Sequence, residues 1–257
     1  QYLKGIENPR TKNRTGEKYI NTQGHEFQII KYNNANDCHV MFNDGTILKG
    51  KSYIQIKKGE VKNPNEPSIL NIGYIGQGIY NSFEHRNIYN TWSHILKRCY
   101  SEEVQKKYPT YKDVTVSEEW HCFQNFAQWY EKNYNPETMQ GWHIDKDILI
   151  KGNKIYSSET CCFVPNTINI LFIKRQNKRG EYPIGVILEK RTNRFISRVV
   201  KNNIKIHLGI FNTPEEAFEA YKTAKEKHIK EVAEKYKNQI TEEVYEALYN
   251  YQVEITD

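Results

Sequence analysis

The span from Gly141 to Phe172 constrains the fold most, because it places ionisable side chains between two short apolar segments. Its sequence is GWHIDKDILIKGNKIYSSETCCFVPNTINILF. The Asn/Gly and Ser/Ser pairs within it favour turns, and a helix is expected to follow Pro165. The pattern therefore predicts a compact hairpin that leads into a helix and holds polar side chains for binding or catalysis.

The charge balance of the chain favours a polyanionic partner. The 257 residues include 37 Lys and Arg against 31 Asp and Glu, which gives a formal net charge of +6. A net positive charge attracts nucleic acid but does not require it, so a basic protein without such a partner stays an alternative. The charged and aromatic content indicates a globular chain, and its length is enough for one to three domains.

The cysteines predict neither disulfides nor a thiolate zinc site. The count is odd, and no two cysteines have the CxxC spacing of a metal site. Free buried thiols in a reducing compartment are expected. No apolar run approaches the roughly 20 residues of a membrane helix, and we expect no membrane partner and a cytoplasmic location.

The spacing of turn and apolar residues predicts a multi-domain α+β protein. Three parts are expected: residues 1–67, 68–176 and 177–257. In the first part, the runs FQIIKY, CHVMF and SYIQIKKG predict strands, and the NDGT between them predicts a hairpin. Several short strands in so few residues indicate a small β-barrel of the SH3-like type.

Helical spacing of apolar residues appears in both later parts. Helices are expected over residues 87–100, within residues 114–134 after a short strand, and from Thr213 onwards. Ser117 is a candidate cap for the second helix. For the third helix, Thr213 followed by Pro214 and Glu216 predicts a capping box. Another helix is expected after Thr241.

The C-terminal part resembles the Apetala (ethylene-responsive-factor) type of DNA-binding domain. The resemblance rests on YPIGV, RFISRVV and HLGIFNTPEEAFEAY. It implies a three-stranded sheet that is backed by a helix and enters the major groove of double-stranded DNA. The resemblance implies that four outward-facing side chains contact the DNA: Glu189, Arg198, Lys205 and His207. Arg191 and Arg194 are expected beside the first turn. Ile187 and Val200 stand where that family tends to have Arg, so its base specificity is not carried over.

A basic segment precedes this part. IKRQNKRG places four cations in eight residues: Lys174, Arg175, Lys178 and Arg179. Such a segment between modules is typical of contacts with a phosphate backbone, and a solvated tether is the alternative.

The middle of the chain resembles a phage-type HNH homing endonuclease. The resemblance rests on TWSHILKRCY, TVSEEWHCFQNFAQWY, IDKD and YSSETCCFVP. It implies a ββα site that holds Mg²⁺ or another divalent metal through Asp145 and Asn169. The catalytic His of the family stands directly after the Asp, but this chain has Lys146 there. His143, two residues before Asp145, is the candidate substitute for the base, with Lys146 as the other.

The sequence is compatible with three hypotheses about the function. The first is a metal-dependent nuclease that cleaves or nicks duplex DNA, encoded by a phage or prophage and acting in the bacterial cytoplasm. The second is a DNA-binding protein that keeps the HNH fold without cleavage, with Lys146 on a phosphate. The third is a module with a protein partner, such as an inhibitor of a host defence enzyme, although the basic charge argues against DNA mimicry. RNA is not excluded as the nucleic acid.

Overall fold

The computed structural model describes residues 12–173 and 181–257, and the chain has a mixed α/β fold with several small sheets. Two compact units are present. The first unit comprises residues 1–93 with 121–124, and the second comprises residues 94–120 with 125–257. The three domain ranges expected from the sequence stay a prediction.

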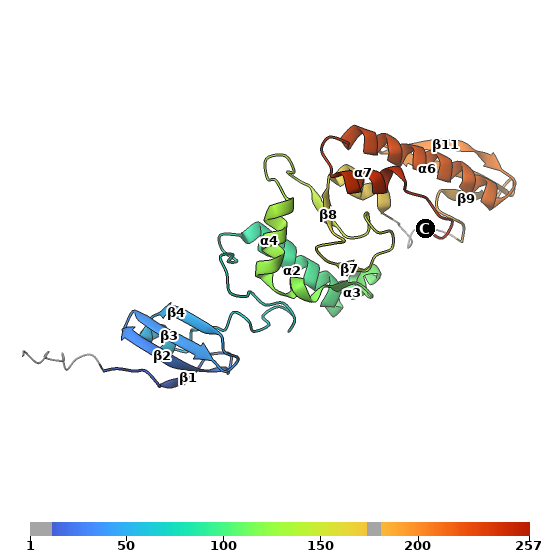
Figure 1. The fold of residues 1–257 in the computed structure, drawn as a ribbon. Helices are drawn as coiled ribbons and strands as arrows, with labels where there is room; N and C mark the ends of the chain where they lie inside the picture. Colours follow the sequence, from blue (N-terminus) through green and yellow to red (C-terminus); the bar gives the residue numbers. More distant parts are fainter. Residues whose placement is uncertain (1–11, 174–180) are drawn as a thin grey trace, which may run out of the picture. The chain divides into compact units, whose positions relative to one another are not determined.

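The first unit contains an antiparallel sheet with the strand order β1-β2-β3-β4 (Figure 1). The strands are β1 (Lys18–Ile20), β2 (Glu26–Asn34), β3 (Asp37–Phe42) and β4 (Ile47–Lys51). Inward-facing side chains from β2 and β3 form its core with Ile56 and Val61. In this order β1 and β4 are the two edges of an open sheet, so the prediction of a closed barrel was wrong.

The third run that predicted a strand is helical. SYIQIKKG forms α1 (Tyr53–Lys57) instead, and Ile56 enters the core from it. Ser52 caps this helix: its hydroxyl accepts the Gln55 N–H at 3.2 Å, while the Gln55 side chain accepts the Ser52 N–H at 3.3 Å. This reciprocal pair satisfies two amide donors at the helix start, which outweighs the weak strand alternation of the sequence.

The Gln124 side chain makes hydrogen bonds to the backbone of the segment between Ile75 and Tyr80. Its amide nitrogen donates to the carbonyls of Ile75 and Tyr80, and its oxygen accepts the Tyr80 N–H. Gly76 and Gly78 lie so close to this region that a Cβ on either would collide with Cys122 or Gln124. The irregular IGYIGQG segment is therefore an ordered connector. It leads to α2 (Arg86–Tyr100), the helix expected at residues 87–100.

The second unit begins in α2 and continues through short elements. These are α3 (Glu102–Lys107), η1 (Pro109–Tyr111), β5 (Thr115–Val116), η2 (Glu118–His121) and α4 (Phe123–Asn133). The Ser117 hydroxyl has no hydrogen-bond partner, so the predicted cap is absent, and η2 precedes α4. Next come β6 (His143–Asp145), β7 (Ile155–Tyr156), β8 (Cys162–Val164), α5 (Asn166–Asn169) and η3 (Ile170–Phe172).

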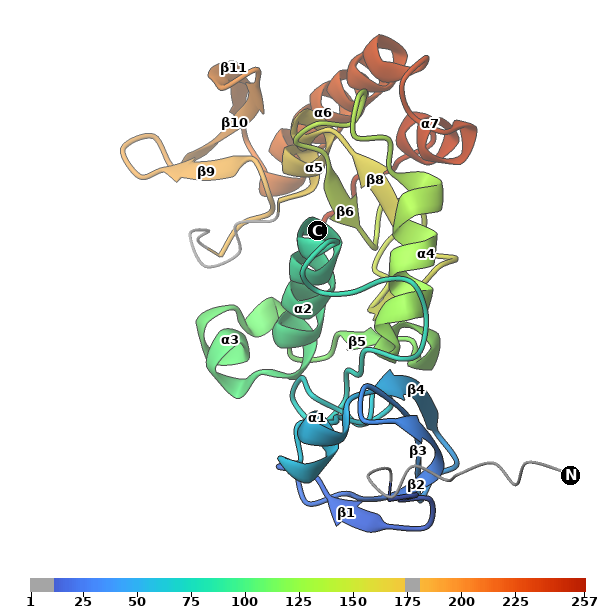
Figure 2. The same ribbon diagram turned by 90° about the vertical axis from the view of Figure 1, so that its left-hand side faces the viewer.

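The C-terminal residues form a three-stranded antiparallel sheet with the order β11-β10-β9 (Figure 2). Its strands are β9 (Val186–Glu189), β10 (Arg194–Lys201) and β11 (Ile204–Phe211), followed by α6 (Pro214–Tyr236) and α7 (Glu242–Tyr249). The capping box of Thr213 and Glu216 is present, as predicted. Val186 and Val199 face α6 and pack against Ala217, Phe218 and Tyr221.

One long helix joins two cores within the second unit. The first half of α6 packs on the three-stranded sheet. In its second half, Ile229, Val232 and Ala233 pack with Val164 and Ile168 from β8 and α5. The hairpin and the C-terminal sheet are therefore parts of one packed body, because α6 contributes to both.

All five cysteines are buried and unpaired, as the sequence predicted. Among the residues that the structure describes, no helix is long and apolar enough to cross a membrane.

Candidate functional site

The span from Gly141 to Phe172 forms a small antiparallel pair followed by a short helix. β6 pairs with β8 so that His143 lies opposite Val164 and Asp145 opposite Cys162. After Pro165 the chain enters α5, and Ile168 on that helix is fully buried. This local order brings the polar residues of β6 and of the following loop next to an apolar core.

Asp145 organises the turn that follows β6. Its Oδ1 accepts the backbone N–H groups of Asp147 at 2.8 Å and Ile148 at 2.9 Å. Burial, together with the nearby Asp147 carboxylate, raises the pKa of Asp145 to about 6. One oxygen of the predicted metal ligand is therefore already used to hold the backbone.

Lys146 is buried rather than exposed to solvent. Its Nζ donates to Asp147 Oδ2 at 3.2 Å and to the carbonyl of Asn153 at 3.0 Å. Asn153 in turn donates its Nδ2 to the Lys146 carbonyl at 2.6 Å. The Lys146 side chain is only 11% exposed, so its ammonium closes the loop instead of reaching towards a ligand.

The other predicted catalytic residues take no part in the hydrogen bonds that close this loop. His143 is exposed at the start of β6, and Asn169 is half-buried at the end of α5. Within residues 12–173 and 181–257, no three His, Cys, Asp or Glu side chains are grouped closely enough to hold a metal ion. Asp145 and Asp147 provide the oxygen atoms that Mg²⁺ prefers, but the Lys146 ammonium already neutralises part of their charge. The donor set thus fits a divalent metal only in part, and we derive no catalytic step from it.

The face of the C-terminal sheet that points away from α6 is a second candidate site. On this face Arg198 of β10 lies directly opposite His207 of β11, and Val200 lies opposite Lys205. All four side chains are exposed. Arg194, at the other end of β10, is also exposed and lies opposite Glu189 of β9. Arg191 is exposed just before β10, in the turn that follows β9.

Cations therefore occupy both ends of this outer face. No ion pair of Arg191, Arg198 or Lys205 is present within the described part of the chain, and Arg194 donates a hydrogen bond to the Ile210 carbonyl at 3.3 Å. Lys174, Arg175, Lys178 and Arg179, which were predicted to contact phosphates, lie outside the described residues.

Between the two groups of cations lies a row of isoleucines. Ile187, Ile196 and Ile210 are aligned across the three strands in the register of the sheet. Ile187 is 48% exposed and Ile210 is 42% exposed, while Ile196 between them is half-buried. The sequence marked Ile187 as apolar, but the row became apparent only with the register.

A bulge explains why Ile210 joins this face. Ser197 pairs with Gly209 while Arg198 pairs with His207, so Leu208 is an extra residue in β11. Gly209 has φ of +146°, and a Cβ there would lie 3.0 Å from the ring of Phe211. Strict alternation from His207 would turn Ile210 inward, whereas the bulge turns it outward and places Phe211 against the core.

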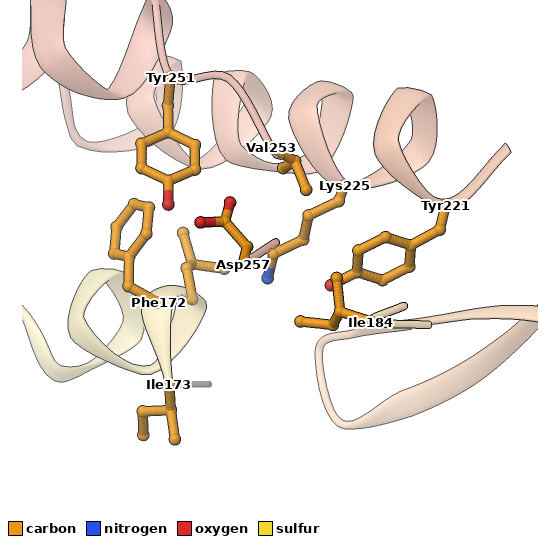
Figure 3. Close-up of a pocket in the computed structure, with 9 residues that line it drawn as sticks. Phe172, Ile173, Ile184, Tyr221, Lys225, Tyr251, Val253 and Asp257 are labelled. Carbon is orange, nitrogen blue, oxygen red and sulfur yellow. The ribbon is translucent and has the colours of Figure 1, made fainter. Parts of the chain in front are cut away.

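A small cavity lies between α6, η3 and the segment after α7 (Figure 3). Lys225 extends into it from α6, and Phe172, Ile184, Tyr221 and Val253 are among its walls. Its volume of about 20 Å³ is enough for a single water molecule. Burial lowers the pKa of Lys225 to about 8. The Asp257 carboxyl also lines the cavity, but its ion pair is with Lys151, at 2.9 Å. No sequence motif indicates this cavity, because its walls come from distant segments.

Comparison with protein-family models, with curated proteins and with solved structures finds no significant match to this chain.

Proposed function

We propose that the chain is a double-stranded DNA-binding protein that uses the outer face of β9, β10 and β11. The observation that carries the proposal is the set of exposed Arg194, Arg198 and Lys205 side chains on a face that α6 leaves uncovered. The strands of a β-sheet are one of the elements that proteins place in the major groove of DNA. Exposed guanidinium and ammonium groups contact phosphates and guanine edges at little desolvation cost.

The unpaired state of these cations supports a polyanionic ligand. A cation already bound to a protein carboxylate gives up that interaction when it meets a phosphate, whereas Arg198 and Lys205 have no such partner within residues 12–173 and 181–257. Each phosphate that they neutralise releases condensed counterions. The affinity is therefore expected to fall steeply as salt is raised.

In this proposal the hairpin of β6 and β8 supports the fold and does not cleave. Lys146 and Asp145 are both engaged in closing the loop after β6. A buried ammonium neither removes a proton from water nor reaches a phosphate. The hairpin packs on the second half of α6, whose first half backs the sheet, so it stiffens the DNA-binding face.

Binding is tested by fluorescence anisotropy with a labelled mixed-sequence duplex over a series of salt concentrations. Arg198→Ala is expected to weaken binding by about 1–3 kcal/mol and to lower the salt dependence. Lys227→Ala is the matched control, because Lys227 is an exposed cation on α6 and lies outside the sheet. Equal losses in the two variants, or affinity that ignores salt, would refute the proposed face.

A second candidate function is metal-dependent nicking, which the position of His143 favours. His143 is exposed two residues before Asp145 on the same strand, where a general base has access to water. Supercoiled plasmid incubated with Mg²⁺, Mn²⁺ or EDTA distinguishes the two functions. Metal-dependent nicking that is lost in His143→Ala would establish the nuclease, and binding without nicking agrees with the proposed function. If no DNA is bound, a protein partner becomes the better account.

A further inference from the structure

We propose that the row of Ile187, Ile196 and Ile210 reads thymine methyl groups, so that the sheet prefers duplexes rich in A·T pairs. This inference rests on the proposed DNA binding and adds which chemical group of the base pairs is recognised. The outer face of β9, β10 and β11 is cationic at both ends and apolar in the middle.

The row has the dimensions of a groove contact. Its three side chains come from adjacent strands in direct register, so they lie side by side across the sheet. Neighbouring strands are about 4.8 Å apart, and three of them span roughly 10 Å. With Arg194 and Arg198 towards the two backbones, the row lies along the floor of the major groove, and the groove width of about 12 Å is spanned along the strand direction.

The flanking charges determine which occupant suits the apolar row. Arg194 lies two residues before Ile196 on β10, and Arg198 lies two residues after it, which puts all three on the same face. Positions two residues apart on a strand are separated by about 6.6 Å. Cations on both sides of the isoleucines match the two phosphate backbones that border a groove. An apolar protein surface would leave these cations buried without partners.

The base edges differ in how well they accept an apolar neighbour. Thymine presents its 5-methyl group in the major groove, and apolar side chains pack against that methyl. Cytosine presents an amino donor at the corresponding edge, and an isoleucine over it would remove water without supplying an acceptor. Burial of one methyl group favours binding by about fourfold, so several contacted thymines give a measurable preference.

The test compares two duplexes that differ only in the methyl group. Alternating poly(dA-dT) and poly(dA-dU) of equal length are titrated with the full chain at fixed salt. Thymine is expected to bind about fourfold more tightly per contacted methyl group. In Ile187→Thr and Ile210→Thr the difference is expected to shrink, because threonine keeps the β-branched carbon while replacing the ethyl group by a hydroxyl.

Ile155→Thr is the control, because Ile155 is an exposed isoleucine of β7 and lies outside the sheet. Equal affinity for the two duplexes would overturn the inference and leave DNA binding intact. Absence of binding to both would overturn the proposed function as well. If light scattering shows a dimer that Ile187→Thr dissociates, the row is an interface between two copies of the chain, and the inference is overturned.

Discussion

The loop after β6 and the outer face of the C-terminal sheet both contain lysine, but they use it in opposite ways. Lys146 is buried and donates to Asp147 and Asn153, whereas Lys205 is exposed on the sheet. A buried ammonium costs desolvation energy that its partners must offset, and it then holds the loop in one shape. An exposed ammonium adds little to the fold and keeps its charge for a ligand. Burial, rather than residue type, separates the structural cation from the binding cation.

The largest expected effect comes from exchanging the same residue in the two regions. Lys146→Met keeps most of the side-chain volume but leaves Asp147 and the Asn153 carbonyl without their donor, so the free energy of unfolding should fall by about 2–4 kcal/mol. Lys205→Met should change it by less than about 0.5 kcal/mol. Urea unfolding followed by circular dichroism measures both. If Lys146→Met were as stable as Lys205→Met, the contrast between the two regions would disappear.

A smaller effect is expected at Asp145, where charge and hydrogen bonding can be separated. Asp145→Ala removes the acceptor of two backbone N–H groups and should cost about 1–3 kcal/mol of unfolding free energy. Asp145→Asn keeps an acceptor oxygen and removes a partly buried charge, so its stability at pH 7 should equal or exceed that of the natural chain. The same urea titration compares the variants. An equal loss in both would mean that the charge itself holds the turn, for instance through a bound cation.

The smallest effect concerns Lys225, a third lysine that is neither paired nor fully exposed. Its folded pKa of about 8 lies below the usual value near 10.4, so the unfolded chain binds more protons between these values. The penalty for burying the charge is fully present below pH 8 and disappears as the pH rises towards 10.4. Lys225→Met should therefore be more stable at pH 7 by about 1–2 kcal/mol, and this gain should vanish near pH 10.5.

Thermal unfolding of both chains across this pH range measures the difference. Lys227→Met is the control, since its exposed ammonium gives no reason for a pH-dependent gain. A gain in Lys225→Met that stays constant with pH would come from packing alone and would argue against a buried charge.

The sequence predicted local structure well where one short motif decides it. Thr213 and Glu216 identify the start of α6, and the alternation of apolar residues identifies the strands of the C-terminal sheet. The same kind of motif occurs at α1, where Ser52 and Gln55 form a capping box inside a run whose composition predicts a strand.

Features that depend on contacts between distant residues could not be predicted from the sequence. The inward direction of Lys146 requires the loop to return so that the Asn153 carbonyl accepts a hydrogen bond from its ammonium, and no local pattern encodes that return. The row of isoleucines likewise depends on strand register, which alternation alone does not determine. The candidate residues could thus be identified from the sequence, but their burial and their neighbours could not be predicted from it.

The extra residue at Leu208 makes the outer face of the sheet tolerant of a change in the length of β11. Deletion of Leu208 would restore strict alternation while keeping Ile210 outward and Phe211 inward, because His207 and Gly209 would then be neighbours opposite Arg198 and Ser197. A regular ladder at the present length would instead pair Leu208 with Ser197 and turn Ile210 inward and Phe211 outward. Loss of one residue here therefore preserves the outer face, whereas a one-residue slip in pairing exchanges it.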